Sequence, residues 1–574
     1  MSAADSNDTA ELRKKLGKEL ERMRVLIIDR HSSARNSLRA ILSTLDISAI
    51  HNAGTSTEVM RQVKAYDFDV IFADYILDDG RDGQQLLEEL RQNHLIPLST
   101  VYMLVTAERS YQNVVAVAEL APDDYLIKPF TAEQLQARLI KALYKKRFFE
   151  RVFRHLDNGA FTDALAACEA LLGTDEQFLY DILRFKGEIL NALGRHEEAK
   201  AVYQQVLDHA VVPWARMGLA IALHGLDDLA EAENIGCALI DDFPEYLAAY
   251  DFVASVREEM GRLAEAQETL LKAAAISPNN STRQRIVGDV AVRNNALDVA
   301  ERAYGKVLER HRGSSLRIID DYTNLTRVML DRGHTDGARK VTQELRRDWR
   351  GNPQGELAAL VMDSLCANQA GEPAKARQAL EKALAMHEEI QAGQDGGGKS
   401  PLSQKIAVDL AHACLAAGDE ASAQGILGKV AAENHEDRGM IAQIQGVFAK
   451  TGKEESGQAL LAKVGREIVE LNNRGVLAAR GGDLEAAARM LIEAAERVPN
   501  LQFLVNASKA IFTLLARKGW NEDMAARGLR YLQLALAKDA RNSKVVSARE
   551  LYYQAARKYG IEVTSPGNRG PGAT

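Results

Sequence analysis

The sequence predicts two architectures in succession: a doubly wound α/β sheet of five parallel strands, then an all-α superhelical array of helical hairpins. Two observations support this. From residue 24 to about residue 144, short apolar runs alternate with amphipathic segments of helical length. From residue 159 onward, a six-residue motif returns at intervals near 34 residues. A chain of 574 residues is too long for one hydrophobic core, so several domains are expected.

Five short apolar runs are the candidate strands. Each is followed by a helix-length amphipathic segment, the first of which covers residues 33–44. Short apolar runs separated by helices are typical of buried parallel strands covered by helices on both faces. The runs are VLII (25–28), ISAI (47–50), VIFA (70–73), YMLV (102–105) and DYLI (124–127).

Polar residues stand where these strands end. Asp29 follows the first run, Asp74 the third, Thr106 the fourth and Lys128 the fifth. The carboxyl ends of parallel strands share one edge of the sheet, so these side chains are expected to converge there. Two carboxylates suit a hard cation such as Mg²⁺. Asp74 could attack a phosphoryl group as a nucleophile, while Thr106 and Lys128 hold the phosphoryl oxygens.

The order VLIID…FADYILDDGRDG…LVTAE…YLIKPF resembles the receiver domain of two-component response regulators, over about residues 22–148. Three parts of that pattern stand in the family's order and at its spacing: Asp74, the pair Thr106–Ala107 and the triplet Lys128–Pro129–Phe130. The resemblance implies a cis peptide bond between Lys128 and Pro129, which a prolyl bond tolerates far better than other peptide bonds.

The resemblance also implies roles for individual residues. Asp74 would accept a phosphoryl group from a histidine kinase or a phosphotransfer protein. Asp29, Asp74 and the backbone carbonyl of Ile76 would bind Mg²⁺. Thr106 and Tyr125 would form the pair that moves when the phosphoryl group arrives.

The chain departs from the family at one site position. The family has two adjacent acids after the first strand, whereas here Asp29 is followed by Arg30. Arg35 stands where the family often has an arginine, which supports this alignment. Arg30 removes a metal ligand and adds a repelling charge, so Mg²⁺ is expected to bind less tightly. Asp78 or Asp79, in the loop after the third strand, could supply a replacement ligand.

His31 and the four cysteines are expected to have no role in chemistry. His31 is interpreted as a loop residue rather than a metal ligand. The cysteines stand in segments rich in alanine and leucine, without a CxxC pair or a histidine at metal-ligand spacing, which favours buried core positions. They are Cys168, Cys237, Cys366 and Cys414.

A helical hairpin explains the repeated motif. Its first residue is Gly, Asp or Asn, which ends a helix and tolerates a left-handed conformation. The residue five positions later is almost always alanine, which is small enough for two helices to cross closely. The copies are GAFTDA (159–164), GRHEEA (194–199), DDLAEA (227–232), GRLAEA (261–266), NALDVA (295–300), GHTDGA (333–338), GEPAKA (371–376), GDEASA (418–423), GKEESG (452–457) and GDLEAA (482–487), with a looser copy from Gly519.

One hairpin cannot bury its own apolar face, so neighbouring hairpins must stack. The period and the Gly…Ala pairing resemble tetratricopeptide (TPR) repeats over most of residues 150–560, with Tyr203 and Tyr304 at the family's aromatic positions. The resemblance implies binding of a protein or peptide ligand in the groove of the array.

The boundaries between these parts are expected where composition changes. Residues 131–156 lack Pro and Gly, which predicts one continuous helix from the receiver into the array. The Gly-rich stretch near residue 395 predicts a flexible insertion that either divides the array or is an ordinary long loop. The expected segments are a flexible 1–21, a receiver core 22–130, a connector 131–156, a first TPR block 157–390, an insertion 391–401, a second block 402–560 and a disordered tail 561–574.

The composition argues against some classes of binding partner. A net charge of −8 gives no electrostatic case for nucleic acid or an anionic membrane. The N-terminal residues are polar, and the sequence lacks the run of about 18 apolar residues that spans a membrane. We expect a cytoplasmic protein.

The expected function is that of a bacterial response regulator, in which phosphorylation of Asp74 switches protein–protein interactions of the array. The sequence has no HExxH pair, nucleophile elbow or helix-turn-helix, so an output by enzymatic catalysis or DNA binding is not expected. A homodimer is left open. One alternative is a phosphorylation-independent scaffold whose receiver is degenerate because of Arg30. Another is an enzyme site of unrecognised type within the array.

Overall fold

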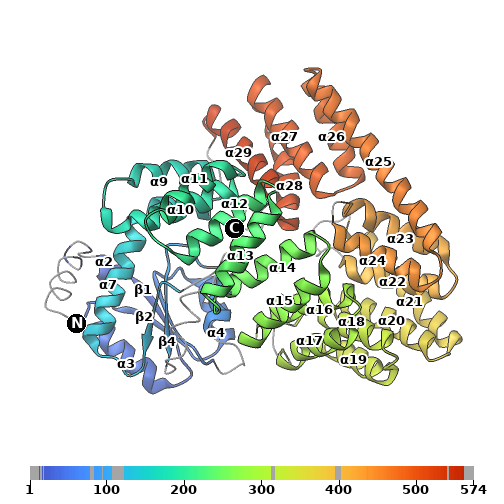
Figure 1. Cartoon of the computed structure of the whole chain (residues 1–574), viewed down its shortest axis with the longest axis horizontal. Helices are drawn as coiled ribbons and strands as arrows, with labels where there is room; N and C mark the ends of the chain where they lie inside the picture. Colours follow the sequence, from blue (N-terminus) through green and yellow to red (C-terminus); the bar gives the residue numbers. More distant parts are fainter. Residues whose placement is uncertain are drawn as a thin grey trace. The chain divides into compact units, whose positions relative to one another are not determined.

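The computed structural model describes residues 12, 14, 16 and 19–561, apart from 78–82, 94, 107–121, 279, 312–316, 395–402, 436, 540 and 541. The chain forms two compact units (Figure 1), one up to Arg262 and the other from Leu263 onward. The first holds the sheet and the first helical hairpins, and the described secondary-structure elements of the second are all helices. No helix among the residues described is both long enough and apolar enough to cross a membrane.

The predicted sheet is confirmed. Within the described residues it has five strands in the order β2-β1-β3-β4-β5, and each neighbouring pair is parallel. The second strand covers residues 49–53 rather than the predicted 47–50, and Ile47 is buried just before it. The strands are β1 (Arg24–Ile28), β2 (Ala49–Ala53), β3 (Val70–Asp74), β4 (Val101–Thr106) and β5 (Asp124–Ile127).

Alternate side chains of the strands enter two separate cores, one on each face of the sheet. In β1, Val25 and Ile27 pack into one core and Leu26 and Ile28 into the other. This alternation follows from the two-residue period of a strand. The first face is covered by α2 (Glu19–Arg22), α3 (Ser32–Ser43) and α7 (Ala132–Phe148), and the second by α4 (Ser56–Ala65) and α5 (Gly83–Gln92), as Figure 1 shows for α3, α7 and α4.

The N-terminal segment differs from our expectation of a flexible stretch. Leu12, Leu16 and Leu20 are buried against the core between the sheet and α7, and the residues described there are helical. Their spacing of four residues places them on one side of a helix. The apolar stripe therefore anchors this segment to the receiver.

The connector is not one continuous helix, which corrects our prediction. The chain turns at Phe149, between α7 and α8 (Glu150–Asp157). Phe149 is fully buried and packs against an aromatic group formed by Phe148, Phe153, Phe178 and Phe185. Tertiary packing, rather than a Pro or Gly, breaks the helix here.

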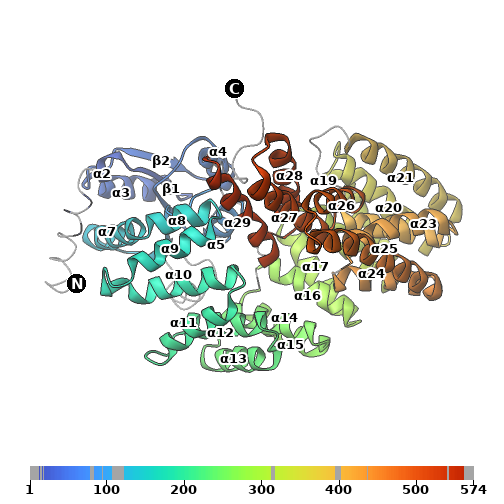
Figure 2. The same cartoon turned by 90° about the horizontal axis from the view of Figure 1, so that it is seen from above.

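After the connector, consecutive helices of the first unit pack against one another in antiparallel hairpins, as Figure 2 shows for α9 to α13. They are α8, α9 (Phe161–Leu171), a short 3-10 turn (Glu176–Phe178), α10 (Leu179–Ala192), α11 (His196–Leu207), α12 (Pro213–Gly225), α13 (Leu229–Asp242) and α14 (Leu247–Glu259).

The second unit continues the same arrangement. Its helices are α15 (Leu263–Ile276), α16 (Ser281–Arg293), α17 (Leu297–Arg310), α18 (Ile319–Asp331), α19 (Thr335–Asp348), α20 (Pro353–Gln369), α21 (Pro373–Gln394), α22 (Gln404–Ala416), α23 (Glu420–Glu433), α24 (Arg438–Lys450), α25 (Glu454–Arg480), α26 (Leu484–Arg497), α27 (Leu501–Lys518), α28 (Glu522–Lys538) and α29 (Ser543–Lys558).

The corner between the two helices of each hairpin has the predicted conformation. All ten motif-leading residues have a positive φ, including the non-glycine residues Asp227 (φ 66°) and Asn295 (φ 55°). The backbone N–H that follows bonds back across the corner, as in Arg195 N to Leu190 O at 2.9 Å. This bond completes a Schellman motif and satisfies a carbonyl at the helix end. The alanine five positions on is buried in every copy that has one.

Glycines allow aromatic side chains to pack directly on the backbone of the preceding helix. Tyr304 of α17 lies over Gly288 of α16, where an added Cβ would be 2.5 Å from the ring. Tyr203 of α11 covers Gly187 of the preceding helix α10 in the same way, and it also covers Gly218 of the following helix α12. Both tyrosines fill the predicted aromatic positions and are buried.

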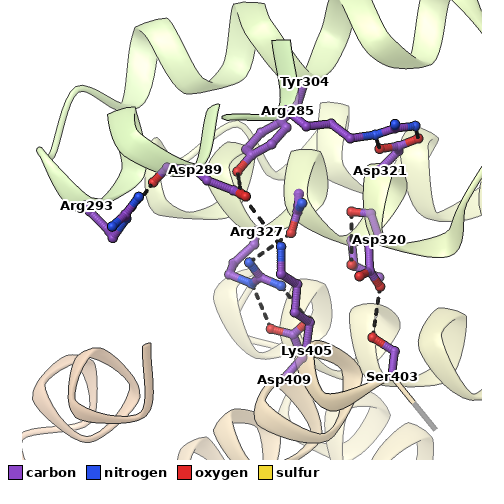
Figure 3. A network of polar contacts seen from close by, with 12 residues as sticks. Arg285, Asp289, Arg293, Tyr304, Asp320, Asp321, Arg327, Ser403, Lys405 and Asp409 are labelled. Carbon is purple, nitrogen blue, oxygen red and sulfur yellow. Dashed lines mark hydrogen bonds and ion pairs between the residues drawn. The ribbon is translucent and has the colours of Figure 1, made fainter. Parts of the chain in front are cut away.

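The array continues across the Gly-rich insertion. Residues 391–394 belong to α21, so the helix extends further than predicted, and 395–402 lie outside the described residues. On the far side, α22 packs against α18 and α20. A polar seam joins α18 to α22 (Figure 3): Arg327 pairs with both carboxylate oxygens of Asp409 at 2.7 and 2.8 Å, and Ser403 Oγ donates to Asp320 Oδ1 at 3.0 Å. The C-terminal tail from residue 562 also falls outside the described residues.

Two glycines in neighbouring helices test the aromatic packing. We expect Gly288→Ala to destabilise the protein by about 1–3 kcal/mol, because its methyl group would collide with the ring of Tyr304. Gly305→Ala in α17 is the matched control: an added Cβ there meets nothing within 4 Å, so the change should stabilise the helix by about 0.5–1 kcal/mol. Denaturant unfolding followed by circular dichroism measures both. If both variants changed the free energy of unfolding in the same direction, the result would contradict this packing.

Candidate functional site

Three of the predicted site residues meet at the carboxyl edge of the sheet. Asp29 follows β1, Asp74 ends β3 and Lys128 follows β5. Lys128 Nζ lies 3.0 Å from Asp29 Oδ2 and 3.1 Å from Asp74 Oδ2. The parallel strand order places these ends side by side, although the residues are far apart in the sequence. The predicted convergence is therefore observed, with one ammonium group between two carboxylates.

The two carboxylates differ in their access to solvent. The side chain of Asp29 is 2% exposed, whereas that of Asp74 is 13% exposed and that of Lys128 is 30% exposed. Burial raises the pKa of Asp74, the charge of Lys128 opposes this, and the negative charge of Asp29 adds to it. For Lys128, burial lowers the pKa, but its bonds and charge interactions with Asp29 and Asp74 together raise it. Asp74 is thus the more accessible acid and carries an electrostatic cost when ionised.

Backbone contacts fix Asp29 and the loop after it. The backbone N–H of His31 donates to Asp29 Oδ1 at 2.8 Å. Arg35 Nη1 donates to the carbonyl of Asp29 at 2.6 Å and to that of Arg30 at 3.2 Å. Arg30 is exposed, and its Nε donates to His31 Nε2 at 2.9 Å. His31 lies directly before α3, in the predicted loop.

A glycine presses against the backbone of Asp74. Gly83, at the start of α5, donates its N–H to the carbonyl of Tyr75 at 2.8 Å. A Cβ on Gly83 would lie 2.5 Å from the carbonyl oxygen of Asp74, so only glycine fits. Ile76 follows with an exposed side chain. Asp78 and Asp79, the suggested replacement ligands, lie outside the described residues.

The predicted switch pair occupies neighbouring strands. Thr106 is buried at the end of β4, and its carbonyl accepts a bond from the backbone N–H of Lys128 at 2.7 Å. The next peptide bond, Lys128–Pro129, is cis as expected. Tyr125 of β5 packs partly against the core, and the Arg138 guanidinium lies 5.4 Å from its ring centre. Ala107, beside Thr106, is outside the described residues.

Known proteins match both parts of the chain. Residues 25–140 match the response regulator receiver domain family, and residues 182–208, 213–235 and 247–280 match tetratricopeptide repeat families. Chemotaxis protein CheY-3 of Vibrio cholerae is 29% identical over 119 residues, which are 21% of this chain and 90% of that protein. Chemotaxis protein CheY of Pseudomonas aeruginosa is 28% identical over 130 residues, 23% of this chain and 98% of that protein.

Residues 25–140 are a response regulator receiver domain. The helical hairpins after the receiver include tetratricopeptide repeats. Among solved structures, a tetratricopeptide repeat protein from Parabacteroides merdae is 17% identical, with 42% of this chain and 92% of that chain covered and a TM-score of 0.28. The C-terminal part of a TPR repeat-containing protein from Cytophaga hutchinsonii is 15% identical, with 44% and 100% covered and a TM-score of 0.35.

The cysteines are unreactive core residues for the most part. Cys168, Cys366 and Cys414 are buried, and Cys237 is half-buried. Burial raises the pKa of Cys168 and Cys414 to about 12 and that of Cys366 to about 11. Their thiols therefore stay protonated at neutral pH.

One residue near the site was missed by sequence analysis. Tyr102 stands in the middle of the apolar run of β4, where it was counted as a strand residue only. Its side chain is fully buried, and its hydroxyl donates to the carbonyl of Gly83 at 2.7 Å. The signal was a hydroxyl-bearing side chain within an otherwise aliphatic buried strand, since such a hydroxyl needs a partner.

Replacing the central acid tests its electrostatic cost. Because the pKa of Asp74 is raised in the folded protein, its contribution to stability is present below the pKa of a free carboxyl and is lost as the pH rises through the folded pKa. We expect Asp74→Asn to raise the unfolding temperature at pH 8, and the gain to shrink as the pH falls towards about 4. Thermal unfolding without divalent cations measures this. A lower midpoint for the variant at pH 8 would contradict the assignment.

Proposed function

We propose that the protein is a response regulator in which phosphorylation of Asp74 switches protein–protein interactions made by the TPR array. The observation that carries the proposal is the position of Asp74 at the edge of the sheet, partly exposed, with Lys128 at 3.1 Å. A histidine kinase or a phosphotransfer protein is the proposed donor. The proposed ligand of the array is a protein or a peptide, and accepting a phosphoryl group is the only chemistry assigned to the chain.

The proposed reaction is a phosphoryl transfer to a carboxylate. An oxygen of Asp74 attacks the phosphorus of a phosphohistidine, a P–O bond forms and the P–N bond breaks. The product is an acyl phosphate, and the electron pair of the broken bond returns to the imidazole of the donor. Lys128 then pairs with a phosphoryl oxygen, and the hydroxyl of Thr106 donates to another.

Asp29, Asp74 and the backbone carbonyl of Ile76 are the residues that would bind Mg²⁺. The fit is partial: two carboxylates share one lysine, which leaves negative charge for a cation, but Arg30 stands where a further acid would be. Among the residues that the structure describes, no group of three His, Cys, Asp or Glu side chains is placed to hold a metal ion. When bound, Mg²⁺ would neutralise the incoming phosphoryl group.

The switch must have a sufficient free-energy difference. Reversing a two-state population from 1:99 to 99:1 requires that phosphorylation favour one state by about 5.5 kcal/mol. In the proposal, Thr106 and Tyr125 change position together, and the array then gains or loses a partner or forms a homodimer.

A phosphorylation-independent scaffold is the second candidate function. The observation that favours it is Arg30, which removes a metal ligand and adds positive charge next to Asp29. In that case the receiver serves as a docking module, and the array binds its partner irrespective of Asp74.

Direct phosphorylation separates the two candidates. The protein is incubated with a small-molecule phosphodonor and Mg²⁺, and its intact mass is measured. We expect the wild type to gain one phosphoryl group and Asp74→Asn to gain none. Copurification from the native cell then compares the partners of wild type and Asp74→Asn. An unmodified wild type, or identical partners for both proteins, would favour the scaffold.

Arg30 provides a second test. A guanidinium near a divalent cation repels it, and a repulsion of about 1.4 kcal/mol corresponds to about tenfold in affinity. We expect Arg30→Asp to bind Mg²⁺ at least about tenfold more tightly than wild type, because it removes this charge and restores a ligand. Arg30→Met removes the charge alone and should lie between the two. Isothermal titration calorimetry with Mg²⁺ measures all three, and equal affinities would rule out a role for Arg30.

A further inference from the structure

The edge of the receiver opposite to Asp74 is bonded to the first helix of the array. The loop between α5 and β4 lies at this edge, and its Leu98 packs into the core of the first hairpins. The backbone N–H of Leu98 donates to both oxygens of Asp157 in α8, each at 3.1 Å. The carbonyl of Leu98 accepts a bond from Lys146 Nζ of α7 at 2.6 Å. The residue is thus held from both sides, by the connector helix and by the array.

Lys146 links this loop to the strands of the receiver. Its Nζ also lies 2.7 Å from Asp123 Oδ1, directly before β5, and 4.8 Å from the ring centre of Phe153 in α8. Its side chain is 13% exposed, and burial lowers its pKa while Asp123 opposes the change. A buried ammonium group is costly unless it is paired, so movement of Asp123 obliges Lys146 to move with it.

Asp123 is bonded in turn to Tyr102 of β4. The backbone N–H of Tyr102 donates to Asp123 Oδ2 at 2.8 Å, and the backbone N–H of Asp123 donates to the carbonyl of Tyr102 at 2.8 Å. The hydroxyl of Tyr102 reaches across the core to the carbonyl of Gly83 at 2.7 Å. Gly83 lies so close to Asp74 that an added Cβ would be 2.5 Å from the carbonyl oxygen of Asp74, and its N–H donates to the carbonyl of Tyr75, the next residue.

We propose that Tyr102, Asp123 and Lys146 transmit a change at Asp74, either phosphorylation or loss of its charge, to α8 of the TPR array. Each step is a hydrogen bond, an ion pair or a close packing contact: Asp74 to Gly83, Gly83 to Tyr102, Tyr102 to Asp123, and Asp123 through Lys146 to Leu98 and Asp157. Packed interiors shift between discrete arrangements rather than yield gradually. A displacement of Gly83 therefore shifts the contacts of Leu98 at the opposite edge of the sheet. This route runs alongside the Thr106 and Tyr125 pair and rests on the proposed function.

The test measures the coupling between Asp74 and α8 directly. Hydrogen exchange of α8 and α9 is recorded in the full chain under two perturbations of the site. One is the phosphodonor with Mg²⁺, and the other is Asp74→Asn, which changes the charge of the site without phosphorylation. The route is interrupted by Tyr102→Phe, which removes only the hydroxyl, and by Lys146→Met.

Lys145→Met is the matched control. Lys145 stands beside Lys146 in α7, but its Nζ pairs with Asp181 of α10 at 2.7 Å rather than with Asp123. We expect each perturbation to change exchange in α8 at least threefold in wild type and in Lys145→Met, and less than 1.5-fold in Tyr102→Phe and Lys146→Met. The extent of phosphorylation should be the same in all four. Should Lys146→Met fail to fold, Tyr102→Phe decides alone.

The outcomes separate this inference from the proposed function. In one outcome, the wild type takes no phosphoryl group, while Asp74→Asn changes exchange in α8 only when Tyr102 and Lys146 are unaltered. That result would overturn the proposed function and keep the route. A wild type that is phosphorylated and responds equally in Tyr102→Phe and Lys146→Met would overturn the route and keep the function. A wild type in which neither perturbation reaches α8 would also overturn the route.

Discussion

One ammonium group shared by two carboxylates is the interaction on which the receiver site depends. Asp29 and Asp74 come from different strands and would repel each other at a largely buried edge. Lys128 lies within 3.1 Å of both, and its own position is fixed by the backbone bond to Thr106. Since one positive charge faces two negative ones, the site keeps an excess of negative charge. Burial and this negative charge raise the pKa of Asp74, against the opposing charge of Lys128.

The array depends on a different constraint, a left-handed residue at each hairpin corner. Eight of the ten motif-leading residues are glycine, and Asp227 and Asn295 take the other two places. Asp and Asn are the side chains that tolerate this conformation best after glycine. The corner fixes how the second helix leaves the first, and the buried alanine then lets the two helices approach. Repetition of one local geometry therefore produces the stack, without any long-range signal in the sequence.

The sequence was sufficient for the features that depend on local pattern and known topology. The apolar runs predict where the strands end, so Asp29, Asp74 and Lys128 could be predicted to lie together. The break at Phe149 could not be predicted, because it results from aromatic side chains contributed by residues up to Phe185. The N-terminal helix carried a usable signal in Leu12, Leu16 and Leu20 that the polar composition of the segment masked. The contacts of Tyr102 and Lys146 require the tertiary structure, since their partners are distant in sequence.

The polar seam between α18 and α22 has a consequence for the integrity of the polypeptide itself. Arg327 and Asp409 stand on opposite sides of residues 395–402, as do Asp320 and Ser403, and α20 packs against α22 across the same gap. The second unit is therefore held together by side chains and not only by the peptide chain that connects them. A protease that cut once within that stretch would leave two fragments still associated, and the nicked protein would migrate as one species until it was denatured.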